Sequence, residues 1–287
     1  MKVFPKFLII GSNGLLGSNI VKILKKNNYK FKTLARDKAT YNLDLHNIKK
    51  FKNIFKLENF NYVINCAGIT NLKYCEKNFK EAKKINSDIP RVLANLSVNY
   101  KFKYIHISTD QVYYGKKNNK NKETDKIFPL NNYSKTKRLG EIYALRSKKS
   151  LVLRTNFAGR ANLKKRTFSN WIFNAIKYKK KIFVYNDIFS STLDVETCAK
   201  VILKIAFSNA RGVYNLGASD AISKKDFIIN FAKFLKKRII YISKNYDDNL
   251  LKKAKNLGLN NSKIEKKLKI KMINSNKSIH NMVKNYL

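Results

Sequence analysis

The first half of the chain alternates short apolar runs with longer segments whose apolar residues fall at helical intervals. The short runs, bounded by polar or glycine positions, predict strands. They are Phe7–Ile10, Phe31–Leu34, Tyr62–Asn65, Tyr104–Ser108 and Leu151–Arg154. The periodic segments predict helices, and they are Leu15–Leu24, Ile48–Phe55, Glu81–Val98 and the segment that contains Tyr133. Strands separated by helices need crossover connections, so we expect an α/β fold with a doubly wound parallel sheet.

Beyond Asn156 the regular alternation ends. Two amphipathic helices are predicted, at Trp171–Tyr178 and at Val195–Phe207, the second with Asp194 as its N-cap. In SKKDFIINFAKFLKK, Ser223 and Asp226 have the spacing of a capping box at the start of another helix. The tail from residue 257 is short, basic and mixed. The polar run KKNNKNKETDK at 116–126 predicts a mobile surface loop.

Composition places the chain among globular proteins. Its 287 residues suffice for one large or two modest domains, and 44% hydrophobic with 28% charged residues argues against disorder. The 61 Lys+Arg against 18 Asp+Glu give a formal charge of +43, which attracts polyanions nonspecifically. The lysines are scattered among abundant Asn and Ile, however, so we expect no specific nucleic-acid or membrane partner.

The cysteines and histidines do not form a metal-binding pattern. They are Cys66, Cys75, Cys198, His46, His106 and His280. An odd number of widely spaced cysteines without a CxxC pair argues against disulfides and zinc, and the histidines are isolated, so no metal site is predicted. With no secretory signal and no apolar stretch long enough to span a membrane, we expect a cytoplasmic protein.

The segment GSNGLLG lies between the first predicted strand and the first predicted helix. Its glycines permit a tight turn and close approach of backbone to a pyrophosphate, while the helix N-terminus offers free N–H groups. The spacing is GxxGxxG rather than GxGxxG, but strand before and helix after supply the expected context. The sequence therefore predicts a Rossmann-like dinucleotide site; its candidates here are Gly11, Asn13, Gly14, Leu15, Leu16 and Gly17.

The end of the second predicted strand indicates which dinucleotide is bound. A carboxylate there would bind a ribose 2'-hydroxyl, whereas an arginine would receive a 2'-phosphate. Arg36 favours NADPH, with NADH as the alternative if Asp37 takes the carboxylate role. In NLDLHN, Asp44 and Leu45 are candidates for contact with the adenine.

HISTDQVYYG and NNYSKTKRLGE carry the candidate chemistry. Thr109 follows a strand at its carboxyl end, where doubly wound sheets bind ligands. Tyr133 and Lys137 stand one helical turn apart and so share a face. A phenol with an ordinary pKa near ~10 transfers protons at neutral pH only if a nearby positive charge favours the phenolate. These three residues predict a proton-donating site.

In this order, GSNGLLG, NCAG at 65–68, HISTDQVYYG and YSKTK resemble the extended short-chain dehydrogenase/reductase family. The similarity is greatest to the dTDP-4-dehydrorhamnose reductase group of nucleotide-sugar reductases. Later stretches, among them NDIFSSTLDVETCAKVI and LGLNNSKIEKKL, extend the resemblance over nearly the whole chain. It implies a dinucleotide-binding domain at 1–155 and a smaller, mainly substrate-binding domain at 156–287, with segments around 190–210 returning to the first.

The resemblance also implies a mechanism. NADPH would deliver hydride to the 4-keto carbon of a nucleotide-linked 6-deoxysugar in dTDP-rhamnose biosynthesis, Tyr133 would protonate the oxygen, and Thr109 would hydrogen-bond it. Lys137 would lower the phenol pKa and hold the nicotinamide ribose. Further residues implied are Asn65, Cys66, Ala67 and Gly68 along the dinucleotide, Asn86 as a structural and proton-relay residue, and Thr70, Ser108, Gln111 and Asn156 at the substrate.

Two departures from the family pattern concern the sugar. Gln111 stands where the rhamnose-forming enzymes more usually have Tyr, and RTNFAG at 154–159 differs from their Arg-Thr-Ser-Trp pattern. Gln111 also argues against a dehydratase, because an amide cannot replace a titrating carboxylate. An epimerase and a noncatalytic dinucleotide-binding regulatory subunit stay open as alternatives. A homodimer is compatible with the sequence, which does not specify the oligomeric state.

Overall fold

A computed structural model describes residues 5–115, 120–161, 167–247 and 251–287. Contacts between Cα atoms divide the chain into two compact units, each assembled from separate stretches. Unit 1 comprises 1–112, 129–154 and 199–214, and unit 2 comprises 113–128, 155–198 and 215–287. The segment 199–214 thus groups with the N-terminal unit, whereas 113–128 groups with the C-terminal one. The assignment of cofactor binding to one unit and substrate binding to the other stays a prediction.

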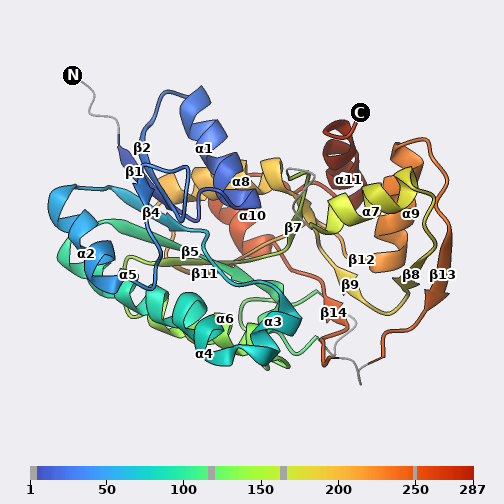
Figure 1. The fold of residues 1–287 in the computed structure, drawn as a ribbon, viewed down its shortest axis with the longest axis horizontal. Coiled ribbons are helices and arrows are strands. Elements are labelled where there is room, and N and C mark those ends of the chain that lie inside the picture. The colour runs from blue at the N-terminus through green and yellow to red at the C-terminus, as the bar shows by residue number, and fades with distance from the viewer. Residues whose placement is uncertain (1–4, 116–119, 162–166, 248–250) are drawn as a thin grey trace. The chain divides into compact units, whose positions relative to one another are not determined.

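Unit 1 is organised around a sheet that, within the described residues, has seven strands in the order β11-β6-β5-β4-β1-β2-β3 (Figure 1). Its strands are β1 (Lys6–Ile10), β2 (Lys30–Ala35), β3 (Tyr41–Asn42), β4 (Tyr62–Asn65), β5 (Lys103–Thr109), β6 (Leu151–Thr155) and β11 (Gly212–Leu216). Strand β1 runs parallel to both β2 and β4, and β4 runs parallel to β5. From β1 the chain adds β2 and β3 on one side of the sheet and then β4, β5 and β6 on the other. The boundary between β1 and β4 is therefore the switch point where doubly wound folds bind ligands. The predicted Rossmann-like fold class is confirmed.

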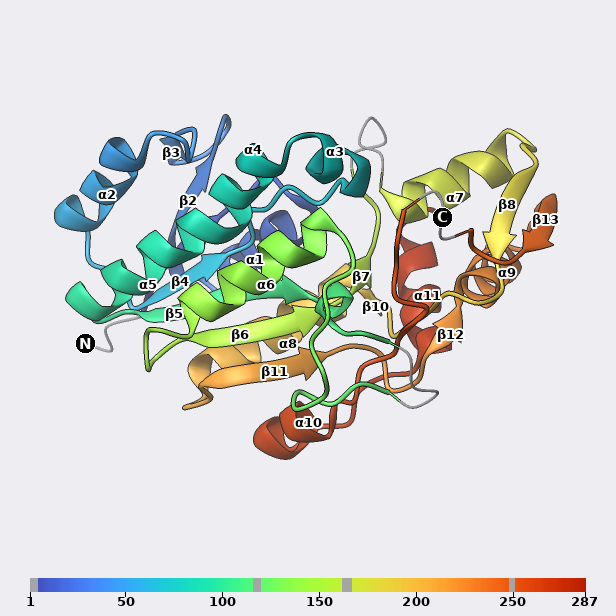
Figure 2. The same cartoon turned by 90° about the horizontal axis from the view of Figure 1, so that it is seen from below.

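Helices cover both faces of this sheet. Figure 2 shows α2, α5 and α6 on one face, with α1 and α8 on the other. The helical elements are α1 (Leu15–Lys26), α2 (Ile48–Leu57), α3 (Leu72–Lys77), α4 (Phe79–Lys83), α5 (Ile89–Asn99), α6 (Asn132–Ala144) and α8 (Val195–Phe207), which enters unit 1 at Ala199. Helix α8 has the predicted bounds, and Asp194 caps it by accepting from Thr197 N at 2.8 Å.

The helix predicted over 81–98 is interrupted. A π-helical turn, Lys84–Asp88, separates α4 from α5. Such turns insert one extra residue per turn and often occur at functional sites. Periodicity cannot reveal this turn, because Ala82 of α4 and Ile89 and Leu93 of α5 keep helical spacing although they pack into different clusters.

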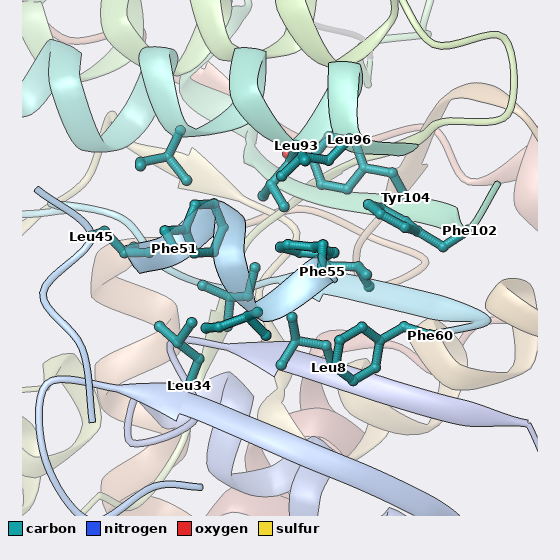
Figure 3. Packing of buried hydrophobic residues seen from close by; sticks show 14 of the residues in the cluster. Leu8, Leu34, Leu45, Phe51, Phe55, Phe60, Leu93, Leu96, Phe102 and Tyr104 are labelled. Carbon is teal, nitrogen blue, oxygen red and sulfur yellow. The ribbon is translucent and has the colours of Figure 1, made fainter. Parts of the chain in front are cut away.

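The core between the sheet and α2 and α5 combines aliphatic side chains with a group of packed aromatic rings (Figure 3). Phe55, fully buried, stacks on Phe102 with ring centroids 5.3 Å apart and meets Phe51 edge-on at 5.6 Å. Offset and edge-on ring pairs are the geometries that aromatic quadrupoles favour. Burial of these rings holds the sheet and helices rigid below the carboxyl ends of the strands.

Unit 2 combines short strands with four helices in its described part. Its elements are β7 (Phe157–Ala158), α7 (Phe168–Lys177), β8 (Ile182–Tyr185), β9 (Phe189–Ser190), β10 (Leu193–Asp194), β12 (Ile222–Ser223), α9 (Lys224–Phe234), β13 (Tyr241–Lys244), β14 (Asn256–Leu257), α10 (Ser262–Leu268) and α11 (Ser275–Lys284). Its core packs α7, α9 and α11 through residues such as Ile172, Phe231 and Met282. Ser223 caps α9 as predicted, accepting from Asp226 N at 3.0 Å.

The loop predicted to be mobile is anchored over the part that can be described. Residues 116–119 lie outside the described residues. Asn121 is buried; its backbone N–H donates to Gly258 O at 2.7 Å, and its side chain donates to the same oxygen at 2.8 Å. Asn215 in turn donates to Asn121 O at 2.8 Å. Polar composition suggested mobility, but these polar groups pair with distant backbone within unit 2.

Candidate active site

The glycine turn between β1 and α1 has no room for side chains. Gly11 has φ +75°, and a Cβ there would lie 2.7 Å from Ala67 N. A Cβ on Gly17 would lie 2.3 Å from Gly11 O, which is backbone and cannot move aside. Gly14 is the N-cap of α1 and offers no side chain to its first N–H groups. The backbone is thus shaped to receive an anionic group at the helix start, as a dinucleotide pyrophosphate requires.

The other candidate cofactor residues of this turn are Asn13, Leu15 and Leu16. Leu16 is buried in the interior, while Leu15 is half-buried. The side chain of Asn13 donates to Asp37 at both its backbone oxygen, at 2.6 Å, and its carboxylate, at 3.0 Å. Asp37 is therefore joined to the glycine turn.

Arg36 is exposed, and within the described ranges its guanidinium makes no hydrogen bond or ion pair. Its charge does act on Asp44, whose pKa lies below its ordinary value, chiefly through hydrogen bonds from His46. One oxygen of Asp44 accepts from His46 N at 2.8 Å, and Leu45 belongs to the apolar core. Arg36 thus keeps its donors available beside the candidate adenine residues.

The segment after β4 lies against the glycine turn and is tied to the helices by one amide. Ala67 N, the atom nearest to Gly11, donates to Asn65 Oδ1 at 3.1 Å. Asn86, in the π-helical turn, binds both backbone groups of Ile69 and also donates to Thr136 Oγ1 at 3.1 Å. Cys66 is half-buried, and Gly68 and Thr70 are exposed. The expected structural role of Asn86 agrees with these bonds.

Helix α6 carries buried candidate site residues, among them Tyr133 and Lys137. Its N-terminus is fixed by a capping box in which Asn131 and Ser134 bond each other's backbone. Tyr133 adjoins Thr109 at the end of β5; the Thr109 hydroxyl donates to Asp110 Oδ1 at 3.1 Å, and Lys137 Nζ donates to Ile107 O at 2.6 Å. Tyr133 is 7% exposed and Lys137 4%. Thr109, Tyr133 and Lys137 are thus brought together.

Burial is the largest cause of the pKa shifts of Tyr133 and Lys137. It raises the pKa of Tyr133 above its ordinary value, opposed by the Thr109 hydrogen bond and assisted by the charge of Asp110. Lys137 is not among the groups that shift this phenol. Burial lowers the pKa of Lys137 to about 8, opposed chiefly by the negative charge of Glu141. At neutral pH the phenol therefore keeps its proton, and the amine is still largely charged.

Three predicted substrate residues have different surroundings. Ser108 donates its hydroxyl proton to Glu141 Oε1 at 2.6 Å and is buried, so this proton is not offered to a ligand. Gln111 is half-buried, and its backbone N–H donates to Thr109 Oγ1 at 3.2 Å. Asn156 belongs to unit 2, where its side chain accepts from Thr192 at 3.1 Å.

The sequence reasoning missed the buried pair Glu141–Arg154. Arg154 donates Nε to Oε1 at 3.0 Å and Nη2 to Oε2 at 2.9 Å. Both side chains are almost fully buried, which is rare for charged groups unless they are paired. Two signals were available: an arginine ending the apolar run LVLR, and a glutamate one helical turn beyond Lys137.

No helix in the described part of the chain is both long and apolar enough to cross a membrane.

Comparison with known proteins shows which proteins this chain is similar to. The chain is 28% identical to the spore coat polysaccharide biosynthesis protein SpsK of Bacillus subtilis, over 77% of this chain and 76% of that protein. It is 29% identical to a dTDP-4-dehydrorhamnose reductase of Aggregatibacter actinomycetemcomitans, over 78% and 77% respectively. The crystal structure of a dTDP-4-dehydrorhamnose reductase of Bacillus anthracis in complex with NADP has the same fold, with a TM-score of 0.90 and 20% identity over 99% of this chain and 100% of that one. The resemblance inferred from the motifs is confirmed: since the family described as RmlD substrate binding domain matches residues 5–287, the chain belongs to that family.

Proposed function

We propose that this protein is an NADPH-dependent reductase of the 4-keto group of a nucleotide-linked 6-deoxysugar, acting in deoxysugar and cell-surface polysaccharide biosynthesis. The observation that carries the proposal is that Tyr133 and Thr109 adjoin at the end of β5, on a helix whose next turn presents the buried Lys137. The reductase of Aggregatibacter actinomycetemcomitans supports the same reaction class, and the name of SpsK supports a place in polysaccharide biosynthesis.

The glycine turn and Arg36 fit the cofactor. A backbone that a Cβ at Gly11 or Gly17 would block suits a pyrophosphate, and Arg36 has donors available for a 2'-phosphate. NADPH, when bound, supplies the hydride; NADH is the second choice. The segment Cys66–Gly68 lines the dinucleotide, Asp44 and Leu45 lie at its adenine, and Lys137 binds the nicotinamide ribose.

The chain's own groups complete the reduction. As the carbonyl carbon gains hydride, its oxygen develops negative charge, and Thr109 would turn the hydroxyl proton that it gives to Asp110 Oδ1 at 3.1 Å toward that oxygen. Tyr133 gives its phenolic proton to the same oxygen, forming the alcohol, and recovers a proton from solvent. Gln111, Thr70 and Asn156 are the residues that we assign to the sugar. Free, buried thiols at Cys75 and Cys198 suit a cytoplasmic enzyme. The homodimer stays a prediction.

The test is a panel of nucleotide-linked 4-keto-6-deoxysugars with NADPH or NADH, following loss of the reduced nicotinamide absorbance. Stoichiometric oxidation of NADPH is expected with at least one sugar; an epimerase would retain its cofactor through the cycle. Tyr133→Phe should lower kcat by about 10²–10⁴ while leaving the Kd for NADPH nearly unchanged. Tyr143→Phe, on the same helix, is the matched control. Unchanged biological activity of Tyr133→Phe would instead indicate a regulatory subunit. If neither NADPH nor NADH is oxidised with any of the sugars, the reductase proposal is refuted.

A further inference from the structure

Two basic turns of unit 2 each follow the end of a helix. The first joins α7 to β8, and the second joins α9 to β13. Ile182 N at the start of β8 donates to Ile240 O just before β13 at 3.0 Å, so both turns lead into the same pair of strands (Figure 2). The exposed cations of the two turns are Lys179, Lys180, Lys181, Lys236, Lys237 and Arg238. Neither 168–186 nor 227–246 contains an acidic residue that would neutralise them.

The strands β8 and β13 carry an apolar outer face beside these turns. They run parallel, with Phe183 opposite Ile242. Ile182 and Val184 belong to the core formed with α7 and α9, and because side chains alternate along a strand, Phe183 points away from that core. Phe183 is 54% exposed, Ile240 49% and Ile242 39%. Parallel strands usually bury both faces, so an open apolar face on such a pair indicates a binding surface.

Cations also lie on the aromatic rings of this region. Lys244 Nζ, on β13, lies 4.2 Å from the ring centroid of Phe183, and Lys177 Nζ lies 5.4 Å from that of Tyr178. Tyr178 follows the last residue of α7 and is exposed. At these distances an ammonium is attracted to the face of the ring. Positive and apolar groups are therefore interleaved along both segments rather than separated.

Stabilisation of the helix ends does not account for all these cations. A cation stabilises a helix C-terminus only within the last turn. Lys177 and Lys233 already occupy the last turns of α7 and α9. The six cations of the basic turns lie beyond those helices, and within the described ranges none of the six forms an ion pair. Their charge is therefore available to a partner.

We propose that the basic turns and the outer face of β8 and β13 dock on an anionic lipid surface. The cations complement acidic headgroups, while Phe183, Ile240 and Ile242 enter the boundary between headgroups and acyl chains. Lysines scattered along the sequence gave no reason to expect a membrane partner, but folding gathers six cations beside one apolar face. A nucleic acid offers the same charge, yet its phosphate backbone provides no apolar contact for the isoleucines. The proposal does not depend on the reductase reaction.

The experiment is co-sedimentation of the full chain with vesicles of phosphatidylcholine, with or without phosphatidylglycerol, at low salt and at ~0.15 M salt. Binding is expected only to vesicles that contain phosphatidylglycerol, and it should be weaker but still measurable at the higher salt. Lys181→Gln/Arg238→Gln should lower the partition coefficient about 10- to 30-fold, since each cation near such a surface contributes about fivefold. Phe183→Ser/Ile242→Ser should lower it at least about tenfold at the higher salt.

Matched controls lie on α2 in unit 1. Lys49→Gln/Lys52→Gln removes two exposed cations, and Leu57→Ser removes an apolar side chain that is 82% exposed. Each should change the partition coefficient by less than about threefold, because salt limits each charge to its own surroundings. Losses in the controls equal to those in the β8 and β13 variants would overturn the proposal, as would a lack of binding to the anionic vesicles.

A second measurement does not depend on loss of binding. Trp171→Phe removes the only tryptophan of the chain, and Ile242→Trp in that background places a single reporter on the outer face. Its emission should move to shorter wavelength on anionic vesicles, because the indole leaves water; an unchanged emission would contradict the docking of this face. Duplex DNA is the competing polyanion. If it binds as tightly as the vesicles, and Phe183→Ser/Ile242→Ser weakens neither, the surface binds nucleic acid and the lipid proposal is wrong.

Discussion

The side chain of Asn86 hydrogen-bonds both backbone groups of Ile69. Its Oδ1 accepts from Ile69 N at 2.9 Å, and its Nδ2 donates to Ile69 O at 3.0 Å. The same Nδ2 donates to Thr136 on α6. One buried amide therefore couples the segment beside the glycine turn to the helix that bears Tyr133. The π-helical turn brings this amide into place, and Gly140 allows the approach, since a Cβ there would lie 2.2 Å from Asn86 O.

Asn86→Ala should destabilise the protein and loosen the site at once. It removes the three bonds, leaves the half-buried Ile69 N–H without this acceptor and leaves Ile69 O with the Cys75 thiol at 3.5 Å, for which we expect a loss of about 2–3 kcal/mol in the free energy of unfolding. The Kd for NADPH should rise as well. Urea denaturation and cofactor fluorescence measure the two effects. Asn78→Ala, which removes an exposed bond to Tyr74 O, should affect neither. Equal effects of the two substitutions would contradict the coupling.

Gly17→Ala should damage the cofactor turn although alanine favours helices. Helix propensity would contribute about 1 kcal/mol in favour of alanine. The new Cβ would stand 2.3 Å from Gly11 O, however, and relief of such a clash costs about 1–3 kcal/mol and displaces the turn. We expect no gain in stability and at least about a tenfold loss of NADPH affinity. Ser18→Ala, at an exposed neighbour, is the control; unchanged NADPH affinity in Gly17→Ala would show that the turn does not bind the cofactor.

Arg36→Ala should change the choice of cofactor more than the reaction. A charge-assisted hydrogen bond to a 2'-phosphate contributes about 1.5–3 kcal/mol, so the Kd for NADPH should rise about 10- to 100-fold. The Kd for NADH, which lacks that phosphate, should hardly change. Lys25→Ala removes an equal charge at the far end of α1 and serves as the control. If NADPH and NADH weaken to the same extent, Arg36 does not recognise the 2'-phosphate.

Lys137 should make stability depend on pH in an identifiable window. Its pKa is about 8 in the folded protein against 10.5 for the ordinary side chain, because burial disfavours the charge. Between these values the unfolded chain binds more protons than the folded one, so stability rises with pH through the window. Relative to Lys137→Met, the free energy of unfolding should increase by about 3 kcal/mol from pH 8 to pH 10.5. Urea denaturation of both proteins along this range provides the comparison, and parallel curves would show that Lys137 is not desolvated.

The sequence by itself specified the elements with strong periodicity or distinctive turn chemistry. Strand Tyr62–Asn65 and helix Val195–Phe207 have their predicted bounds, because alternation and helical spacing of apolar residues are local properties. The glycine turn was likewise predictable from the sequence, because Gly11 stands so close to Ala67 that a residue with a Cβ would not fit there. The placement of Tyr133 and Lys137 on one face of a helix also followed from their spacing.

Tertiary structure alone decided which distant groups meet. Two-residue strands such as β7 and β10 are too short to show a pattern, and Asn121 found its partners more than a hundred residues away. Ser108 appeared suited to a substrate until its proton was seen to bind Glu141. Glu141 and Arg154 look like ordinary surface charges in the sequence, because the desolvation that makes an ion pair matter exists only once α6 is packed on β5 and β6.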